Sequence, residues 1–178
     1  MNPFLATLGI SSELIAVRGL RECGEATDLE VAEVGAGGRN HLLIPVAAEG
    51  WRNLKEAALD DGISLFIVSA FRSIDRQTEI VRQKLEAGMA IEEILTACAP
   101  PGYSEHHTGR AIDLSTPGSR AVEVEFDQTA AFAWLNVHAA KFHFYLSYPV
   151  GNQCGYQYEP WHWRFNDAHP ITPQDALR

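Results

Sequence analysis

The segment from Val46 to Phe71 constrains the fold most, because it sets one helix directly before one buried strand. Apolar residues recur at helical spacing in its first half, at Val46, Trp51, Leu54, Ala58 and Leu59. Asp60, Asp61 and Gly62 interrupt this pattern and predict the end of the helix. The run ISLFIVSAF, residues 63–71, then predicts a buried strand.

Two further helices are expected after this strand. Ser73 can cap a helix that runs to about Ala87, with an acidic residue in its first turn and Gly88 just past its end. The segment from Ala90 to Ala99 indicates another short helix, which the P-P-G sequence at 100–102 must end. The chain from residue 103 onward therefore starts in a loop.

The second half of the sequence is richer in strands. Arg110–Leu114 alternates polar and apolar residues, and Asp127–Lys141 has the spacing of a helix. Phe142–Tyr148 and Tyr156–Phe165 are aromatic-rich strand candidates separated by a P-V-G-N turn, and the GAGG sequence at 35–38 is expected to join two strands. Helices that precede strands, with a strand pair at the end, indicate an α+β domain.

Length and charge limit the function classes. At 178 residues the chain suits one ordinary domain over residues 1–178, with its own core. The formal net charge of -9 argues against general binding to nucleic acid or to anionic lipid, since either polyanion would be repelled. A small uncharged or zwitterionic substrate stays compatible with this charge.

Cysteine usage and hydropathy bear on the compartment. Cys23, Cys98 and Cys154 are far apart and form no C-x-x-C pair, so they are expected to be free thiols. The first twenty residues show neither a basic leader nor a cleavage site, and no apolar run is long enough to span a membrane. The chain as given is expected to be cytoplasmic, with the periplasm or cell wall as the alternative if another route exports it.

The stretch SEHHTGRAID, residues 104–113, carries two adjacent histidines and an aspartate. A catalytic zinc ion needs three imidazole or carboxylate ligands and leaves its fourth position to water. Either His106 or His107 could pair with Asp113 across the turn that Gly109 allows, and EPWH at 159–162 offers a further histidine. Spacing alone leaves the choice between the two adjacent histidines open.

Glu159 gives this zinc hypothesis a chemical purpose. A water molecule activated by zinc needs a nearby base that accepts its proton, and Glu159 precedes His162 by three residues. Residues three apart in a regular strand point to opposite faces, so Pro160 must mark a bulge or bend. Two neutral imidazoles and one carboxylate would leave about +1 on the zinc, enough to lower the pKa of its water toward roughly 7.

Three ordered motifs carry a family resemblance. S-A-F-R-S at 69–73, S-x-H-x-x-G-x-x-x-D at 104–113 and E-x-x-H at 159–162 resemble the VanY-type D-alanyl-D-alanine carboxypeptidases. These zinc peptidases form a group with the D-Ala-D-Ala dipeptidases and the Hedgehog signalling domain. The similarity covers about residues 41–165 and implies a small antiparallel sheet that carries one zinc ion, with helices packed on it.

The resemblance also implies residue roles. It implies zinc ligation by His106, Asp113 and His162, with Glu159 as general base and then acid, and it makes His107 a neighbour of the metal site. Arg72 matches the family's cation for the oxyanion and the substrate, while Gln77 and Ser104 match positions that hold the substrate terminus. Tyr158 and Trp161 are candidates for lining a substrate groove. Phe71 departs from the pattern, because the family often has Tyr before the arginine.

Three functions fit these residues. The first is a zinc carboxypeptidase that removes the terminal D-alanine of peptidoglycan-type peptides or muropeptides. The second keeps the chemistry but changes the bond, as in an L,D-carboxypeptidase acting on tetrapeptides, a D,D-dipeptidase or a phage-type endopeptidase. The third is a non-catalytic domain with structural zinc, although structural sites are usually closed by four protein ligands. The oligomeric state stays open.

Overall fold

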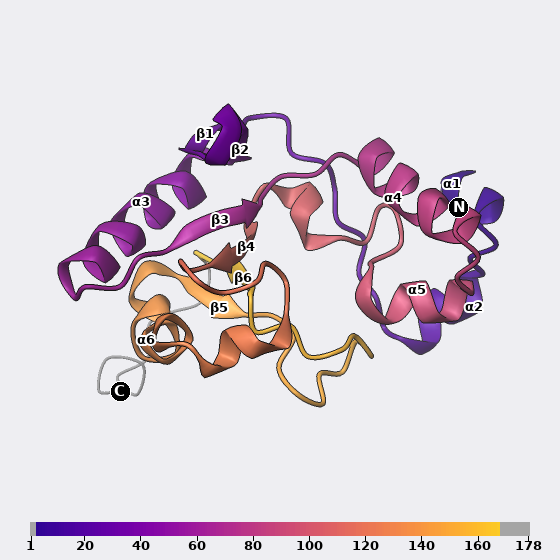
Figure 1. Ribbon diagram of the computed structural model, residues 1–178. Helices are drawn as coiled ribbons and strands as arrows, with labels where there is room; N and C mark the ends of the chain where they lie inside the picture. The colour runs from indigo at the N-terminus through magenta and orange to yellow at the C-terminus, as the bar shows by residue number, and fades with distance from the viewer. Residues whose placement is uncertain (1–2, 168–178) are drawn as a thin grey trace.

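The site is built on a four-stranded antiparallel sheet with the order β3-β4-β6-β5. The structure, a computed structural model, describes residues 3–167. The strands are β3 (Phe66–Ser69), β4 (Ala111–Ser115), β5 (Phe144–Leu146) and β6 (His162–Phe165). This small antiparallel sheet with packed helices (Figure 1) confirms the expected α+β class.

A separate two-stranded ribbon precedes the first long helix. Strands β1 (Glu30–Val34) and β2 (Asn40–Leu43) pair antiparallel, and η1 (Ala36–Gly38) lies between them. Gly37 and Gly38 have φ values of 74° and 79°, which glycine adopts readily. The expectation that the GAGG sequence joins two strands is therefore confirmed.

Helix α3 (Pro45–Asp60) and α6 (Ala130–His138) contribute to one apolar core with this sheet. Trp51 and Leu54 of α3 are fully buried, as their helical spacing predicted. The core continues through β3, β4 and β6 to α6, with Ile67, Ile112, Leu114, Leu135, Trp163 and Phe165 among its members. This core fixes the strands from which the site residues project.

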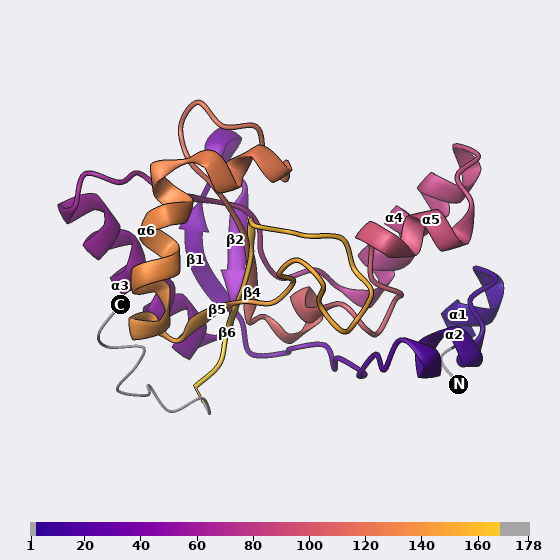
Figure 2. The same cartoon turned by 90° about the horizontal axis from the view of Figure 1, so that it is seen from below.

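A second apolar cluster lies at the other end of the molecule. It joins α1 (Pro3–Thr7), α2 (Ser12–Val17), α4 (Ile74–Glu86) and α5 (Ile91–Ala97), and its buried members include Leu5, Leu8, Ile15, Val81, Ile94 and Leu95. Both views group these four helices away from α3 and α6 (Figure 2). Helices α4 and α5 match their predicted positions, whereas α1 and α2 were not predicted.

Four predicted elements were too long, and one of them, the strand expected over residues 142–148, is only β5. The strand expected over residues 63–71 is only β3, and the helix expected over residues 127–141 divides into η3 (Val124–Gln128), α6 and η4 (Ala139–Phe142). Thr129 begins α6 anew, because its side chain accepts a hydrogen bond from the N–H of Phe132.

The strand expected over residues 156–165 begins only at His162. The N–H groups before it pair elsewhere: Gln157 donates to the carbonyl of Thr96, and Glu159 donates to that of Tyr148. This segment therefore forms a loop that reaches α5 instead of extending the sheet. Among residues 3–167, no helix is both long and apolar enough to cross a membrane.

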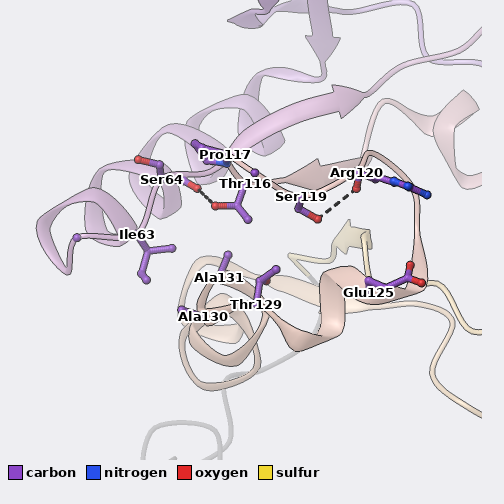
Figure 3. Close-up of a pocket in the computed structure, with 12 residues that line it drawn as sticks. Ile63, Ser64, Thr116, Pro117, Ser119, Arg120, Glu125, Thr129, Ala130 and Ala131 are labelled. Carbon is purple, nitrogen blue, oxygen red and sulfur yellow. Dashed lines mark hydrogen bonds between the residues drawn. The ribbon is translucent and has the colours of Figure 1, made fainter.

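A cavity of about 830 Å³ opens between the chain after α3, the loop after β4 and the start of α6 (Figure 3). Small apolar residues and hydroxyl-bearing residues line it, and the Oγ1 of Thr116 donates to the carbonyl of Ser64 across 2.7 Å. Among residues 3–167, Arg120 and Glu125 are the only charged residues that line it, and no histidine or cysteine does. Size alone therefore does not mark it as a catalytic site.

Candidate metal centre and catalytic cleft

His106 is held by the turn that follows it. It lies in η2 (Glu105–Thr108), and Gly109 ends this short helix with φ 63°. The Nδ1 of His106 lies 2.7 Å from the carbonyl oxygen of Ala70 and must donate to it, since a carbonyl can only accept. Burial also lowers the pKa of His106, which keeps the ring neutral. Its Nε2 lone pair is thereby free to bind a metal.

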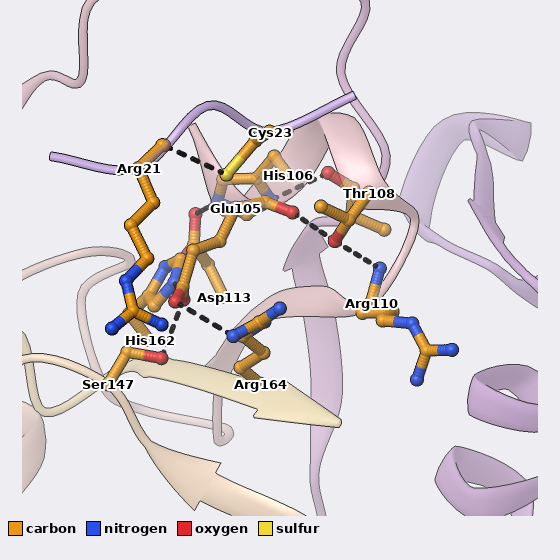
Figure 4. Close-up of polar contacts among 11 residues, drawn as sticks. Arg21, Cys23, Glu105, His106, Thr108, Arg110, Asp113, Ser147, His162 and Arg164 are labelled. Carbon is orange, nitrogen blue, oxygen red and sulfur yellow. Dashed lines mark hydrogen bonds and ion pairs between the residues drawn. The ribbon is translucent and has the colours of Figure 1, made fainter. Parts of the chain in front are cut away.

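Asp113 and His162 face each other on neighbouring strands. They are register partners in the β4–β6 pair, and their Oδ1 and Nδ1 atoms lie 2.9 Å apart. The other carboxylate oxygen of Asp113 lies 3.2 Å from Nε2 of His106. One ligand atom from each of the three residues falls within 4.8 Å of the others, and all three side chains are buried (Figure 4).

This donor set fits a catalytic zinc ion, with two imidazole nitrogens, one carboxylate oxygen and one wall open to a cleft. The charges fit as well. Burial opposes ionisation of Asp113, but the two neighbouring histidines hold its pKa well below the usual range. Burial opposes protonation of His162, yet its hydrogen bonds to Asp113 and Glu105 raise its pKa to about 10. A divalent cation can replace this imidazolium charge.

Glu105 is a site residue that the sequence analysis missed. Its Oε2 accepts hydrogen bonds from Nε2 of His162 at 3.0 Å and from the hydroxyl of Ser147 at 2.6 Å. Arg164 lies 3.6 Å from the other oxygen. A carboxylate behind a ligating histidine fixes the ring and its tautomer. Glu105 lies against His162 in Figure 4 and leaves Nδ1 of this ring facing Asp113, at the candidate metal site.

A tight turn brings Glu159 to the same site. The N–H of His162 donates to the carbonyl of Glu159 at 3.1 Å, with Pro160 between them. The bend predicted at Pro160 is therefore confirmed. Glu159 is 8% exposed and lines the cleft beside the three candidate ligands. Burial raises its pKa to about 7, a value suited to a group that must accept and return a proton.

Arg72 reaches the cleft from the loop between β3 and α4. Its Nη1 donates to Oε1 of Gln77 at 2.8 Å, and its Nη2 donates to the hydroxyl of Ser69 at 3.2 Å. Both partners are neutral, so the guanidinium keeps its full charge for a bound anion. Gln77 is fully buried, and its amide nitrogen donates to the carbonyl of Ala99 at 2.6 Å. Gln77 thus orients Arg72.

His107 supports the same arginine and stands outside the metal-ligand group. Its Nδ1 donates to the backbone carbonyl of Arg72 at 2.6 Å, and its Nε2 accepts the N–H of Gly102 at 3.1 Å. The N–H of Arg72 in turn donates to the carbonyl of His106 at 3.2 Å. Both ring nitrogens of His107 are therefore occupied by structural bonds.

These residues surround a cleft of about 340 Å³. Arg72 lines it from the loop before α4, Ile80 and Lys84 from α4, and Cys98 and Ser104 from the chain after α5. Later segments contribute Val122, Tyr148, Tyr156, Gln157, Glu159 and Trp161. The predicted residues Ser104 and Trp161 are among them, but Tyr158 is not, and its hydroxyl bonds to Asp127. Tyr148 and Tyr156, which the sequence analysis did not single out, supply the aromatic wall.

Comparison with protein families agrees with this geometry. Residues 40–168 match the family model of the VanY D-alanyl-D-alanine carboxypeptidases. The chain belongs to this family. The match includes all three candidate metal ligands, Glu159 and Arg72, and it confirms the resemblance drawn from the three motifs.

Individual relatives from the VanY family support this assignment. The chain is 28% identical, over 82% of its length, to a D-alanyl-D-alanine carboxypeptidase of Enterococcus faecalis, of which it covers 55%. Among solved structures, the LD-carboxypeptidase LdcB has a TM-score of 0.72 at 31% identity, with 79% of this chain and 69% of that chain covered. A mutant of the D,D-pentapeptidase VanY in complex with Zn(II) has a TM-score of 0.61 at 26% identity, covering 79% of each chain. The chain spans about half the length of the curated relatives that it matches.

Proposed function

We propose that the chain is a zinc-dependent D,D-carboxypeptidase that hydrolyses the terminal D-alanine of peptidoglycan-type peptides. The observation that carries this proposal is the buried Glu159 carboxyl, which lines one cleft with His106, Asp113 and His162. Three protein ligands with a base beside an open position are typical of catalytic zinc, whereas structural zinc is usually enclosed by four ligands.

Each residue of the site would have its own role in the reaction. Nε2 of His106, the carboxylate of Asp113 and Nδ1 of His162 would hold one zinc ion. When bound, zinc lowers the pKa of the attacking water and polarises the scissile carbonyl. Glu159 takes the proton from this water as its oxygen attacks, and returns it to the amine nitrogen when the C–N bond breaks.

Arg72 supplies the fixed positive charge that the reaction needs. Its guanidinium is oriented by two neutral partners, so it can stabilise the developing oxyanion or hold the substrate's carboxylate without first breaking an ion pair. Ser104 and Trp161 line the same cleft and would contact the substrate terminus. Gln77, predicted to contact substrate, would act by holding Arg72.

A second candidate is an L,D-carboxypeptidase that cleaves the last D-alanine of tetrapeptides. The TM-score of 0.72 to the LD-carboxypeptidase LdcB favours it. A D,D-dipeptidase or a phage-type endopeptidase would use the same reaction centre with a different substrate pocket. These alternatives differ in the peptide and not in the roles of the metal ligands and Glu159.

Defined peptides test these proposals. The zinc-loaded chain should release one D-alanine from a peptide that ends in D-Ala-D-Ala, and mass spectrometry should detect the shortened product. Release from a tetrapeptide would favour the L,D activity, and release of the intact dipeptide would favour the dipeptidase. Glu159→Ala should keep zinc and lose turnover by several powers of ten. Near-normal turnover in this variant would contradict the mechanism, and no hydrolysis together with unfolding on metal removal would support structural zinc.

A further inference from the structure

Helix α4 presents a second cation to the cleft. Gln77, Ile80 and Lys84 follow one another at helical spacing, so they share one face of the helix. Gln77 holds Arg72 behind the cleft wall, whereas Ile80 and Lys84 line the cleft itself. Lys84 is half-buried, so part of its side chain stays accessible where it lines the cleft.

This lysine has no acidic partner in the part of the chain that the structure describes. Other cations pair with carboxylates, such as Lys55 with Glu33 at 2.6 Å and Arg76 with Glu79 at 2.9 Å. The formal net charge of the chain is -9, so acidic groups are abundant. Asp113 and Glu159 line the metal end of the same cleft, so Lys84, which has no carboxylate partner among residues 3–167, is the cation that favours an anion away from that end.

Cys98 lines the same cleft as the two cations. Its thiol accepts a hydrogen bond from the amide of Gln77 at 3.1 Å. Burial raises the pKa of Cys98, while the positive charges of Arg72 and Lys84 both act against that rise. Both cations therefore act on the same thiol in this cleft, and Lys84 lies farther along α4 than Gln77, which holds Arg72.

The spacing indicates which part of a peptide Lys84 can reach. Seven helical positions separate Lys84 from Gln77, which is about 10 Å along the helix axis. An extended peptide covers about 3.4 Å per residue, so this distance equals roughly three residues. When Arg72 is at the peptide terminus, Lys84 is within reach of a residue about one to three positions before it.

We propose that Lys84 forms a carboxylate-binding subsite, which gives the cleft a preference for D-alanine-ended peptides that carry a second free carboxylate near the terminus. This inference rests on the proposed function, because it assumes that the peptide terminus lies at Arg72. Two groups offer the required chemistry: a side-chain carboxylate on the residue before D-alanine, as in diaminopimelate, and the free α-carboxylate of a γ-linked D-glutamate.

Two pairs of matched peptides distinguish the two possible carboxylates. The first pair differs only in diaminopimelate or lysine at the residue before D-alanine, and the second pair differs only in a free or amidated α-carboxylate on the γ-linked D-glutamate. The zinc-loaded wild-type chain should show a KM about tenfold lower for the charged member of one pair. This ratio should shrink as ionic strength rises, because the contact is partly solvent-exposed.

Variants assign the effect to Lys84. Lys84→Met should bring the ratio of the two KM values within a peptide pair close to one. Lys84→Arg should restore most of the wild-type preference for the charged member. Arg82→Met is the matched control, because it removes one positive charge from the exposed face of the same helix and should keep the wild-type ratio. A wild-type KM ratio near one in both peptide pairs would overturn the proposal. An equal rise in KM for the charged and the uncharged peptide in Lys84→Met would also overturn it.

A binding assay separates this proposal from the proposed function. The same peptide pairs are titrated calorimetrically into zinc-loaded Glu159→Gln, with and without Lys84→Met. Absence of turnover in the wild-type chain, with a carboxylate preference that Lys84→Met abolishes, would refute the peptidase function and keep the subsite. Turnover without any carboxylate preference in binding would refute the subsite alone.

Discussion

At the residue scale, the candidate metal ligands could be proposed from the sequence, whereas the residues that hold them in place could not. Histidine and aspartate in a tight turn, with a second histidine after a glutamate, have few purposes other than metal chemistry, so His106, Asp113, His162 and Glu159 stood out from the sequence. Glu105 did not, because its partner His162 lies 57 residues away and only the fold brings them together. The same is true of the bonds that His107 makes to Arg72 and Gly102.

Glu105→Ala should weaken zinc binding by about 10- to 100-fold, because His162 loses the carboxylate that fixes its ring and its tautomer. Competition with a chromophoric chelator measures the change without any assay of turnover. Glu86→Ala, an exposed carboxylate on α4, serves as the charge-matched control. Equal zinc affinity in the wild type and Glu105→Ala would remove the positioning role.

The two adjacent histidines should separate cleanly. His106→Ala should lose tight zinc binding, whereas His107→Ala should retain it. His107→Ala should nevertheless lower the free energy of unfolding by about 2–4 kcal/mol, since it leaves a cavity and an unpaired buried N–H at Gly102. Metal analysis after dialysis, together with urea denaturation, measures both effects. Loss of zinc from His107→Ala would reassign the ligand.

Glu159 should make the metal-free protein less stable as the pH rises. Its pKa is raised from 4.5 to about 7 by burial, so the folded state holds this proton to a higher pH than the unfolded state does. Stability is therefore lost between these two values, by about 3 kcal/mol once the pH exceeds 7. Relative to the wild type, Glu159→Gln should raise the free energy of unfolding by about 3 kcal/mol at pH 8 and by less than about 1 kcal/mol at pH 5. Urea denaturation of both metal-free proteins measures the difference, and a pH-independent difference would contradict it.

At the element scale, periodicity and caps predicted α3, α4 and α5 well, because each helix carries its own stop signal. The strand expected over residues 156–165 was too long because aromatic content alone cannot distinguish a strand from a cleft loop. Gly109 joins η2 to β4 at the centre of the predicted motif, and its φ of 63° accounts for glycine at this position.

Gly109→Ala should lower the stability of the protein by more than backbone strain alone would account for. A Cβ atom there would lie 2.9 Å from Cδ2 of Leu29 and 3.1 Å from Cγ2 of Ile44. Gly118 has a similar left-handed backbone, φ 87°, but its Cβ would meet nothing within 4 Å. Gly118→Ala should therefore cost about 1 kcal/mol, and Gly109→Ala at least about 2 kcal/mol more. Thermal unfolding compares them, and equal losses would contradict the steric argument.

At the scale of the whole molecule, the cleft lies where the two apolar clusters meet, and its walls come from both. Cys98 belongs to the helical cluster and Trp161 to the sheet cluster, and both line the cleft. No local pattern could predict this arrangement, because the contacts that join the halves are far apart in sequence. Arg18 of the loop after α2, which precedes the family-model match that begins at residue 40, makes two of them, to the carbonyl of Cys154 and to the ring of Tyr156.

Arg18 should strengthen substrate binding without affecting zinc binding. Its Nη1 donates to the carbonyl of Leu95 at 2.7 Å, its Nε donates to that of Cys154 at 2.8 Å, and its guanidinium lies 4.4 Å from the ring centre of Tyr156. Arg18→Met removes both hydrogen bonds and so releases the loop that carries Tyr156. The KM for peptide should rise about tenfold, amide exchange in residues 152–157 should accelerate, and zinc affinity should stay within about twofold. Arg21→Met, an exposed cation nearby, should change none of these values. If Arg18→Met weakened zinc binding as strongly as peptide binding, the loop would instead support the metal centre itself.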